Sequence, residues 1–326
     1  MRARSRKLPF LSVLLTQTTD FSTRARVEGA AAALLDRRHV AVGAHDGGVS
    51  FLRLHDGALI GRFVAAGAIK AALACDPWTG RVWGASHGRD AFALDGPPSC
   101  SATWHSKLDG AVSAPPSFDA TRRRVYFATL AGTLIAVDDS TGEAVLKEAW
   151  RTPVGAAVFG APAVAAGEVV IVSTVKGELR ACAAADGSHV WRIAAGAGPL
   201  FAAPALLADR AFAIIGTHDC ALVCIRCADG GQQWRLPLSG RVAAAAAVDA
   251  VVSGLQQSSA EQLVAVVTVA GEVHVLSVPN AGQPTCVASA TLPGEAFSAP
   301  VMHDRTLLLG CRDDWLYCLQ LRALRE

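Results

Sequence analysis

Ser86 is the first residue of this chain whose surroundings suggest covalent chemistry. It lies in GASHG, residues 84–88, which matches the G-x-S-x-G pattern of a nucleophilic serine. That pattern requires a sharp turn from a strand into a helix, which exposes the serine hydroxyl. GASHG instead aligns with GAHDG at Gly43, GTHDC at Gly216 and GCRDD at Gly310, none of which has serine in the third position. We interpret these stretches as strand ends that lead into hairpins, and we predict no catalytic residue.

A histidine and three cysteines between residues 218 and 227 could ligate zinc. They are His218, Cys220, Cys224 and Cys227, and Cys224-x-x-Cys227 has the spacing of zinc ligands. However, Cys220 and Cys224 occupy positions of a repeat, described below, that are filled elsewhere by glycine and alanine. On a strand, Cys224 and Cys227 also point to opposite faces, because their separation is odd. The sequence has no second Cys-x-x-Cys, so we predict no metal site.

Two further polar groups are interpreted as structural. His45, His87 and His218 share one repeat position, which would place them on one face of a radial array. Hairpins lie far from the axis of such an array, whereas zinc ligands must come within about 2 Å of the ion, so we predict histidines that support turns. Arg122-Arg123-Arg124 precedes the apolar run VYFATL and is predicted to form a solvated turn between strands.

All of these residues are positioned by a repeating unit. Each unit opens with an apolar residue that is followed by small residues and often by proline, which we expect to form an innermost strand. The openings are VEGAA at Val27, IKAAL at Ile69, VSAPP at Val112, VFGAP at Val158, LFAAP at Leu200, VAAAA at Val242 and AFSAP at Ala296.

A hairpin turn follows each opening, and its third residue serves as an anchor. The anchors are Gly47, Arg89, Gly132, Gly177, Cys220, Gly271 and Asp314, and successive anchors are 42, 43, 45, 43, 51 and 43 residues apart. Four residues past each anchor lies an apolar slot that we predict to be buried. The slots are Phe51, Ala93, Ala136, Ala181, Cys224, Val275 and Cys318. Four repeats close with tryptophan: Trp104, Trp150, Trp191 and Trp234.

A constant period near 43 residues that carries short strands is typical of four-stranded propeller blades. We therefore predict an all-β fold, a β-propeller of seven blades over residues 27–326, or of eight blades if a repeat is missing. The long interval contains the polar stretch 251–262, which is predicted to be an inserted loop.

Residues 1–26 lie outside the repeats. MRARSRK followed by LPFLSVLL resembles a targeting signal, but Pro9 interrupts a short apolar run and no clear cleavage site follows, so we favour a frayed terminus or a misplaced gene start. The last repeat ends after its third strand, Trp315–Leu321. Since an open edge is costly, we predict that Phe10–Thr16 (FLSVLLT) pairs with that strand and closes the last blade. The rival is a gap left by a missing first repeat.

The composition excludes several classes of partner. A net charge of +2 over 326 residues gives no strong field for nucleic acid or a membrane surface. No stretch approaches the roughly 18 uninterrupted apolar residues of a membrane helix. The nine cysteines show no pairing pattern and indicate reduced thiols, so we expect a cytoplasmic protein. We also expect the protein to be monomeric.

Several segments resemble known propellers. AVDDSTGEAVLKEAW from Ala136 resembles the pyrroloquinoline quinone (PQQ) type of repeat. KAALACDPWTGRVWGASHGRDAFALD, GTHDCALVCI and GCRDDWLYCL, taken in order, resemble the C-terminal propeller of the β-alanine-activating enzymes, members of the acyl-CoA synthetase family. The resemblance covers about residues 27–321. It implies an adenylating domain and a phosphopantetheine carrier domain before the propeller, and one repeat more than the seven counted here. No motif of either domain occurs in this sequence.

Three functions are compatible with such a fold, because fold does not determine function. The first is a non-catalytic binding or scaffold module that presents loops to a carrier domain, an acceptor substrate or another protein. The second is a PQQ-dependent oxidoreductase, which would need an adjacent Cys-Cys pair and a calcium-binding set; neither is recognisable, so we expect no cofactor. The third is a bacterial-type assembly scaffold with a lipid-modified cysteine near the N-terminus, whereas the first cysteine is Cys75.

Overall fold

The structure, a computed structural model, describes residues 21–321 except residues 24, 140–145, 167, 250–260, 280–281 and 304. Within these ranges the chain folds into seven antiparallel sheets without a helix. It is an all-β propeller of seven blades, as the repeats predict. The described residues contain no helix long and apolar enough to cross a membrane.

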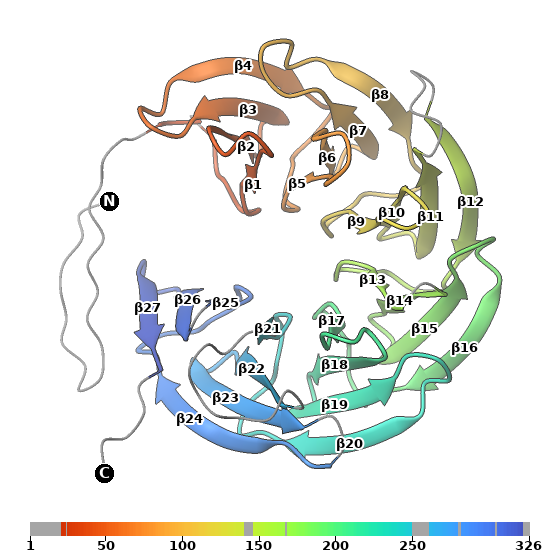
Figure 1. Cartoon of the computed structure of the whole chain (residues 1–326), viewed down its shortest axis with the longest axis vertical. Coiled ribbons are helices and arrows are strands. Elements are labelled where there is room, and N and C mark those ends of the chain that lie inside the picture. Colours follow the sequence, from red (N-terminus) through yellow and green to blue (C-terminus); the bar gives the residue numbers. More distant parts are fainter. Residues whose placement is uncertain are drawn as a thin grey trace. The chain divides into compact units, whose positions relative to one another are not determined.

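The chain divides into two compact units. The N-terminal unit comprises Gln17–Val175 and Arg180–Val190, and the C-terminal unit comprises Lys176–Leu179 and the chain from Trp191 onward. Within each unit the sheets stand side by side, and the first strands of successive sheets contact one another: β1 with β5, β9 with β13, β17 with β21, and β21 with β25 (Figure 1).

The first three blades belong to the N-terminal unit. Blade 1 contains β1 (Ala32–Ala33), β2 (His39–Gly43), β3 (Gly48–Arg53) and β4 (Leu59–Val64). Blade 2 contains β5 (Ala74–Cys75), β6 (Val82–Ala85), β7 (Asp90–Leu94) and β8 (Ala102–Lys107). Blade 3 contains β9 (Ser117–Asp119), β10 (Arg124–Ala128), β11 (Thr133–Asp138) and β12 (Lys147–Pro153).

Four blades follow along the chain. Blade 4 contains β13 (Ala163–Val164), β14 (Val169–Ser173), β15 (Glu178–Ala183) and β16 (His189–Ala194), and blade 5 contains β17 (Ala205–Leu206), β18 (Phe212–Thr217), β19 (Ala221–Arg226) and β20 (Gln232–Pro237). Blade 6 contains β21 (Ala247–Asp249), β22 (Glu261–Val267), β23 (Glu272–Pro279) and β24 (Thr285–Thr291), and blade 7 contains β25 (Val301–His303), β26 (Thr306–Gly310) and β27 (Leu316–Gln320).

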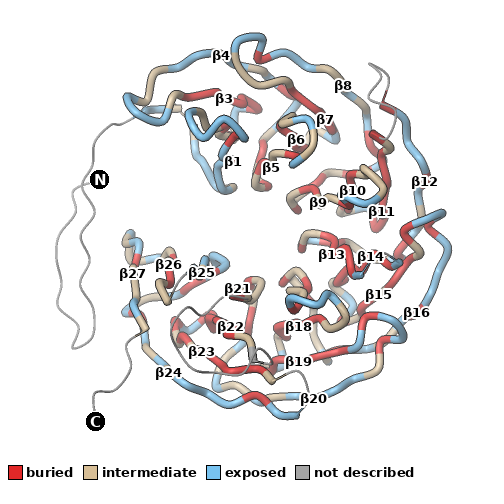
Figure 2. Tube along the Cα trace, in the orientation of Figure 1, coloured by how far each residue is buried: buried red, intermediate tan, exposed pale blue. Residues whose placement is uncertain are grey.

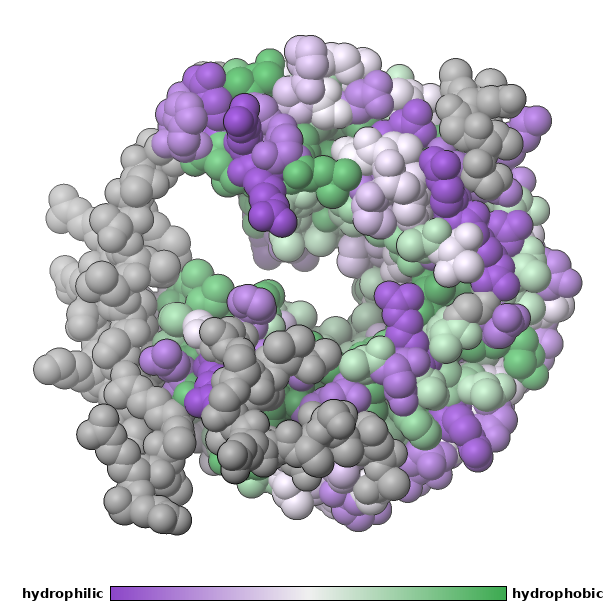
Figure 3. All heavy atoms as spheres, viewed as in Figure 1, coloured by the Kyte–Doolittle hydropathy of each residue, from purple (hydrophilic) through white to green (hydrophobic). Residues whose placement is uncertain are grey.

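Burial follows strand order within a blade. The second and third strands, such as β18 and β19, are buried almost throughout, whereas outer strands such as β20 alternate between exposed and buried residues (Figure 2). This alternation is typical of a strand that packs on one face only. On the face shown in Figure 3, hydrophilic residues are spread over the surface rather than gathered in one patch, in line with the small net charge.

The openings do not form the innermost strands, which corrects the expectation from the sequence. Val112, for example, lies five residues before β9, and the other openings likewise precede their strands. Apart from Val27, which is exposed, their apolar residues are buried, and several bond to the preceding blade: Val112 donates its N–H to Ser86 O at 3.3 Å, and Val242 donates to Thr217 O at 3.1 Å. The proline of an opening such as Pro204 directly precedes the strand, where its missing N–H does no harm.

All seven anchors adopt the left-handed backbone conformation. Their φ angles lie between 60° at Cys220 and 86° at Gly132. Glycine reaches this region without steric cost, whereas other residues pay roughly 1–2 kcal/mol. The turn therefore explains the four anchor glycines, and it identifies Arg89, Cys220 and Asp314 as positions under local strain.

Six of the seven predicted slots are buried, from 0% exposure at Phe51 to 4% at Val275. In five blades the pairing register with the outer strand shifts directly after the slot, as between Cys224 and Ile225, so a β-bulge recurs there. Cys318 is only half-buried, contrary to the prediction, since β27 has no outer neighbour among the described residues.

The tryptophans join successive blades. In the N-terminal unit, Trp150 donates its indole N–H to Ala184 O at 3.2 Å, and in the C-terminal unit Trp191 donates to Cys227 O at 2.8 Å. The Asp-Gly turn of the following blade packs against each indole: a Cβ on Gly187 would lie 2.5 Å from Trp150, and one on Gly230 would lie 3.0 Å from Trp191. The glycine of each of these turns thus leaves room for the ring.

Cys220→Gly is expected to stabilise the protein by about 1 kcal/mol, because glycine relieves the left-handed conformation. Urea denaturation followed by circular dichroism measures the change. Cys286→Gly, the same substitution in strand β24, serves as the control and is expected to destabilise slightly, since glycine weakens a strand. Equal effects of the two substitutions would contradict the role assigned to the turn.

Closure of the last blade stays a prediction, because Phe10–Thr16 lies outside the described residues. Its acceptor is described: β25, β26 and β27 form a three-stranded sheet. Deletion of residues 1–20 is expected to lower the melting temperature by several degrees, because the closing strand is lost. An unchanged melting temperature in differential scanning calorimetry would contradict closure by this segment.

Candidate functional site

Ser86 is not exposed to solvent, so it cannot attack a substrate. Its hydroxyl donates to Ala66 O at 2.6 Å and accepts the N–H groups of Gly88 at 3.1 Å and Asp90 at 3.2 Å. The chain runs from β6 through a hairpin turn into β7 at this point, without the helix that a nucleophilic serine requires. Ser86 therefore holds the turn.

The same hydroxyl role recurs three residues before other anchors. Thr129, Thr217 and Thr268 are fully buried, and each side-chain oxygen accepts the N–H four residues on, at 3.2, 3.1 and 3.1 Å respectively. Sequence reasoning missed these residues. The signal was present, because serine or threonine occupies this position in five of the seven repeats, and such hydroxyls stabilise turns.

The cysteines near residue 220 are not arranged as a metal site. Cys224 and Cys227 are buried, and burial raises the pKa of each thiol to about 12, which opposes the thiolate that zinc requires. Cys220 lies in the strained turn. No group of three or more histidine, cysteine, aspartate or glutamate residues suited to a metal ion occurs within the described ranges.

The arginine run is more structural than predicted. Arg122 pairs with Asp119 at 3.3 Å, and Arg124 donates to the carbonyl oxygens of Ala184 and Ala185 at 2.7 and 2.6 Å. Arg124 thereby ties the start of β10 to the turn of the next blade. The run leads through the turn between β9 and β10, as predicted, but it is half-buried in an inter-blade contact rather than solvated.

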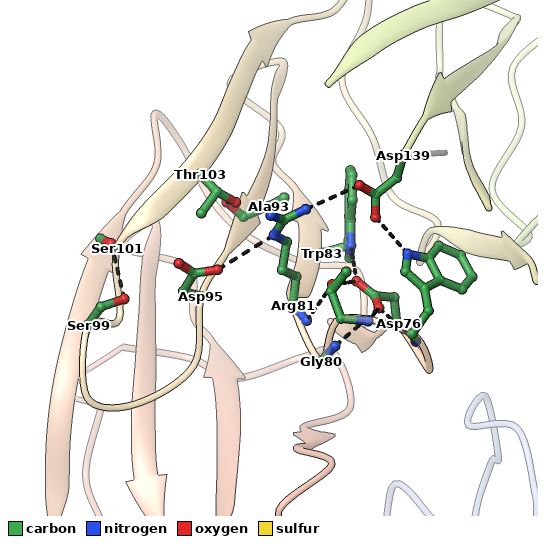
Figure 4. A network of polar contacts seen from close by, with 12 residues as sticks. Asp76, Gly80, Arg81, Trp83, Ala93, Asp95, Ser99, Ser101, Thr103 and Asp139 are labelled. Atoms are coloured by element: carbon green, nitrogen blue, oxygen red, sulfur yellow. Dashed lines mark hydrogen bonds and ion pairs between the residues drawn. The ribbon is translucent and has the colours of Figure 1, made fainter. Parts of the chain in front are cut away.

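The densest polar network joins blades 2 and 3 (Figure 4). Asp76 caps its turn by accepting the N–H groups of Trp78 at 3.0 Å and Thr79 at 2.6 Å, and it also accepts the indole N–H of Trp83 at 2.9 Å. Asp139 accepts from Trp78 Nε1 at 2.6 Å and from Arg81 at 3.2 Å. Both carboxylates are fully buried and bonded, so this network holds blades together and offers no ligand access.

A different set of positions lies beside the hairpins, at least partly exposed except at Val269, and we call them the rim positions. They are the first residue of each hairpin turn and the second residue of each opening. In six blades the hairpin residue donates its backbone N–H to the carbonyl of the residue before the opening, as His87 does to Ala68 at 2.8 Å and Arg312 to Glu295 at 2.9 Å. The backbone is therefore constant at the rim positions.

The side chains at the rim positions vary strongly. The hairpin residues are His45, His87, Leu130, Val175, His218, Val269 and Arg312, and the second residues of the openings are Glu28, Lys70, Ser113, Phe159, Phe201, Ala243 and Phe297. The slots are apolar in every repeat, whereas the residues at the rim positions belong to no single class. The backbone bonds fix where the rim positions lie but do not restrict which side chains occupy them, so the rim positions form the candidate binding surface.

The rim of the N-terminal unit is mainly polar. His45 Nε2 lies 2.8 Å from a carboxylate oxygen of Glu28, and His87 Nε2 lies 2.7 Å from Ser113 Oγ. Burial, followed by the nearby charge of Lys70, lowers the pKa of His87. His45 and His87 thus contact side chains of the openings, and the predicted support of the turn backbone by the three shared histidines stays a prediction.

The rim of the C-terminal unit is aromatic. Phe201 meets His218 edge-on, with ring centroids 4.9 Å apart. The guanidinium of Arg312 lies 4.2 Å from the ring centroid of Phe297 and 3.2 Å from Glu295, and Phe297 is 45% exposed. This unit therefore presents aromatic rings and cations, which sequence reasoning did not identify because each residue looks ordinary when read alone.

Ser86→Ala is expected to lower the free energy of unfolding by about 1–3 kcal/mol, because Gly88 and Asp90 lose their acceptor. Any binding or catalytic activity measured in the presence of this chain should stay unchanged while the chain is folded. Ser99→Ala, at an exposed serine, is the matched control and should have little effect on stability. A large loss of activity with the fold intact would contradict the structural role of Ser86.

Thiol reactivity is expected to follow burial. In the native protein Cys286, which is exposed, should react first with a thiol reagent, whereas Cys224 should stay protected because burial raises its pKa to about 12. Mass spectrometry of the labelled peptides over time measures the order. Rapid labelling of Cys224 without unfolding would show that the repeat alignment is wrong in blade 5.

Comparison with known proteins confirms the resemblance to the propeller of the β-alanine-activating enzymes. The family model for the β-propeller of the β-alanine-activating enzyme matches residues 15–321. The human β-alanine-activating enzyme is 37% identical over 106 residues, which is 32% of this chain and 9% of that protein. The Drosophila melanogaster enzyme is 27% identical over 202 residues, or 59% of this chain and 19% of that protein.

Among solved structures, BamB from Moraxella catarrhalis superposes with a TM-score of 0.68 at 16% identity, covering 95% of this chain and 87% of that one. This likeness shows the fold alone. The match to the family model extends over nearly all of the blades, whereas the chain spans only a small part of the curated relatives. The chain belongs to the β-propeller family of the β-alanine-activating enzyme.

Proposed function

We propose that this chain is a non-catalytic binding or scaffold propeller of a β-alanine-activating, acyl-CoA-synthetase-like protein. The observation that carries the proposal is the contrast at the rim positions, where a constant backbone presents variable side chains. Variable side chains on a rigid frame are typical of recognition surfaces. Ser86, the one residue with a nucleophile-like motif, is committed to a turn, which further supports a binding role.

The relatives named β-alanine-activating enzyme are much longer than this chain. Segments that correspond to the rest of those proteins are therefore the first partners to consider. In this proposal the rim positions contact a carrier domain, an acceptor substrate or another protein, and activation of the amino or fatty acid takes place elsewhere. We propose a monomeric, cytoplasmic chain that needs no cofactor of its own.

Calorimetric titration of the chain with the remainder of the Drosophila relative tests this function. We expect saturable binding, and no ATP–pyrophosphate exchange by the chain alone in the presence of β-alanine. BamB from Moraxella catarrhalis is the matched control, since it shares the fold at 16% identity, and it should not bind. Exchange by the chain alone, or titration without binding, would overturn the proposal.

We expect the chain not to bind PQQ, because no residue set to hold calcium or the carboxylates of the quinone is recognisable in it. Calorimetric titration with PQQ, with and without calcium, measures this directly. Stoichiometric, calcium-dependent binding at micromolar or tighter affinity would instead support the oxidoreductase alternative.

A further inference from the structure

We propose that the rim of the C-terminal unit binds an extended peptide segment that places an acidic side chain beside an apolar one. This inference rests on the proposed binding function and names the chemistry of the partner. The surface consists of Phe201, His218, Arg241, Phe297 and Arg312, which lie at hairpins and openings of blades 5, 6 and 7.

The aromatic part of this surface is held in place before any partner arrives. Arg312 covers the ring of Phe297 and is itself fixed by Glu295, through a side-chain contact at 3.2 Å and the backbone bond of the rim at 2.9 Å. A cation over an aromatic face is attracted by the charge distribution of the ring. Since Phe297 remains 45% exposed, an apolar side chain can cover it at little cost in conformational entropy.

The charged part of the surface includes an arginine that can pair with an anion. Arg241 is exposed, forms no ion pair within the described ranges, and lies close enough to help lower the pKa of His218. The Nε2 atom of His218 is buried and has no hydrogen-bond partner among the described residues. An arginine without a partner binds a carboxylate well, because two parallel N–H groups match two oxygens.

The neighbouring charges favour a peptide over nucleic acid. The same hairpins carry Asp219, Glu272 and Asp313, which would repel successive phosphates. A single carboxylate on a peptide needs only one arginine partner, which Arg241 can provide. Aromatic residues and arginine are also the residues that dominate protein–protein contacts.

Phage display of random 12-residue peptides against the full chain tests the proposal. We expect selected peptides to combine Asp or Glu with Leu, Phe or Trp. In fluorescence polarisation, a selected peptide should bind at least about tenfold more weakly to Phe297→Ala and to Arg241→Glu. Val287→Ala, at an equally exposed apolar residue on the outer strand β24, is the control and should bind as the native chain does.

Four results would overturn the inference: no selected peptide, selected peptides without acidic residues, equal binding to all variants, or tighter binding of a 20-nucleotide oligothymidine probe at the same surface. Thermal melting of each variant shows whether it is folded. If the chain still binds the remainder of the Drosophila relative while peptide binding fails, only the chemistry assigned to this rim is wrong. If both fail, the binding function itself is wrong.

Discussion

The contact between each opening and the preceding blade is the constraint on which the rest of the propeller depends. An apolar residue enters the space between two sheets, and its N–H bonds to the turn of the earlier blade, as Ile69 does with Ala44 O at 3.1 Å. In blades 1 and 5 the receiving strand has glycine at this contact: a Cβ on Gly43 would lie 2.6 Å from Ile69, and one on Gly216 would lie 2.2 Å from Val242. Neither blade can be repacked without the other.

Two further kinds of contact stabilise the turns and the packing of neighbouring blades. Buried hydroxyls such as Thr217 hold the turn that receives the opening, and tryptophans such as Trp191 reach from an outer strand to the following blade. The polar network around Asp76 and Asp139 adds a link between blades 2 and 3. Stability is thus distributed over neighbouring blades, as in other repeat proteins.

The sequence predicts the parts of the fold in which the backbone restricts residue type. The anchors were found because a left-handed turn favours glycine, and the slots because a strand alternates its faces. The openings were wrongly assigned to the first strands, because these strands have only two or three residues, too few for a periodic signal in the sequence. Cys318 was expected to be buried by analogy with the other slots. Burial of this side chain also requires a strand on the outer side of β27, and the sequence of β27 does not indicate whether such a strand is present.

The candidate site was predictable only in part, because the backbone does not restrict the residue type at the rim positions. The rim positions can be counted from the openings and anchors, but the side chains there follow no rule of the repeat. His45, His87 and His218 were noticed because histidine is conspicuous, whereas Phe201 and Phe297 resemble ordinary core residues. Only the structure shows that Phe297 is exposed and lies beneath Arg312.

The indole contacts have a consequence for spectroscopy. Trp150 and Trp191 are nearly buried, and each bonds to a carbonyl of the next blade, one within each compact unit. Indole emission moves to longer wavelength when the ring enters water, so separation of these blades produces an optical signal without an added dye. Each compact unit therefore has an indole at an inter-blade contact. Since the chain has seven tryptophans, a variant that keeps Trp150 or Trp191 as its sole tryptophan would make loosening of one unit visible by itself.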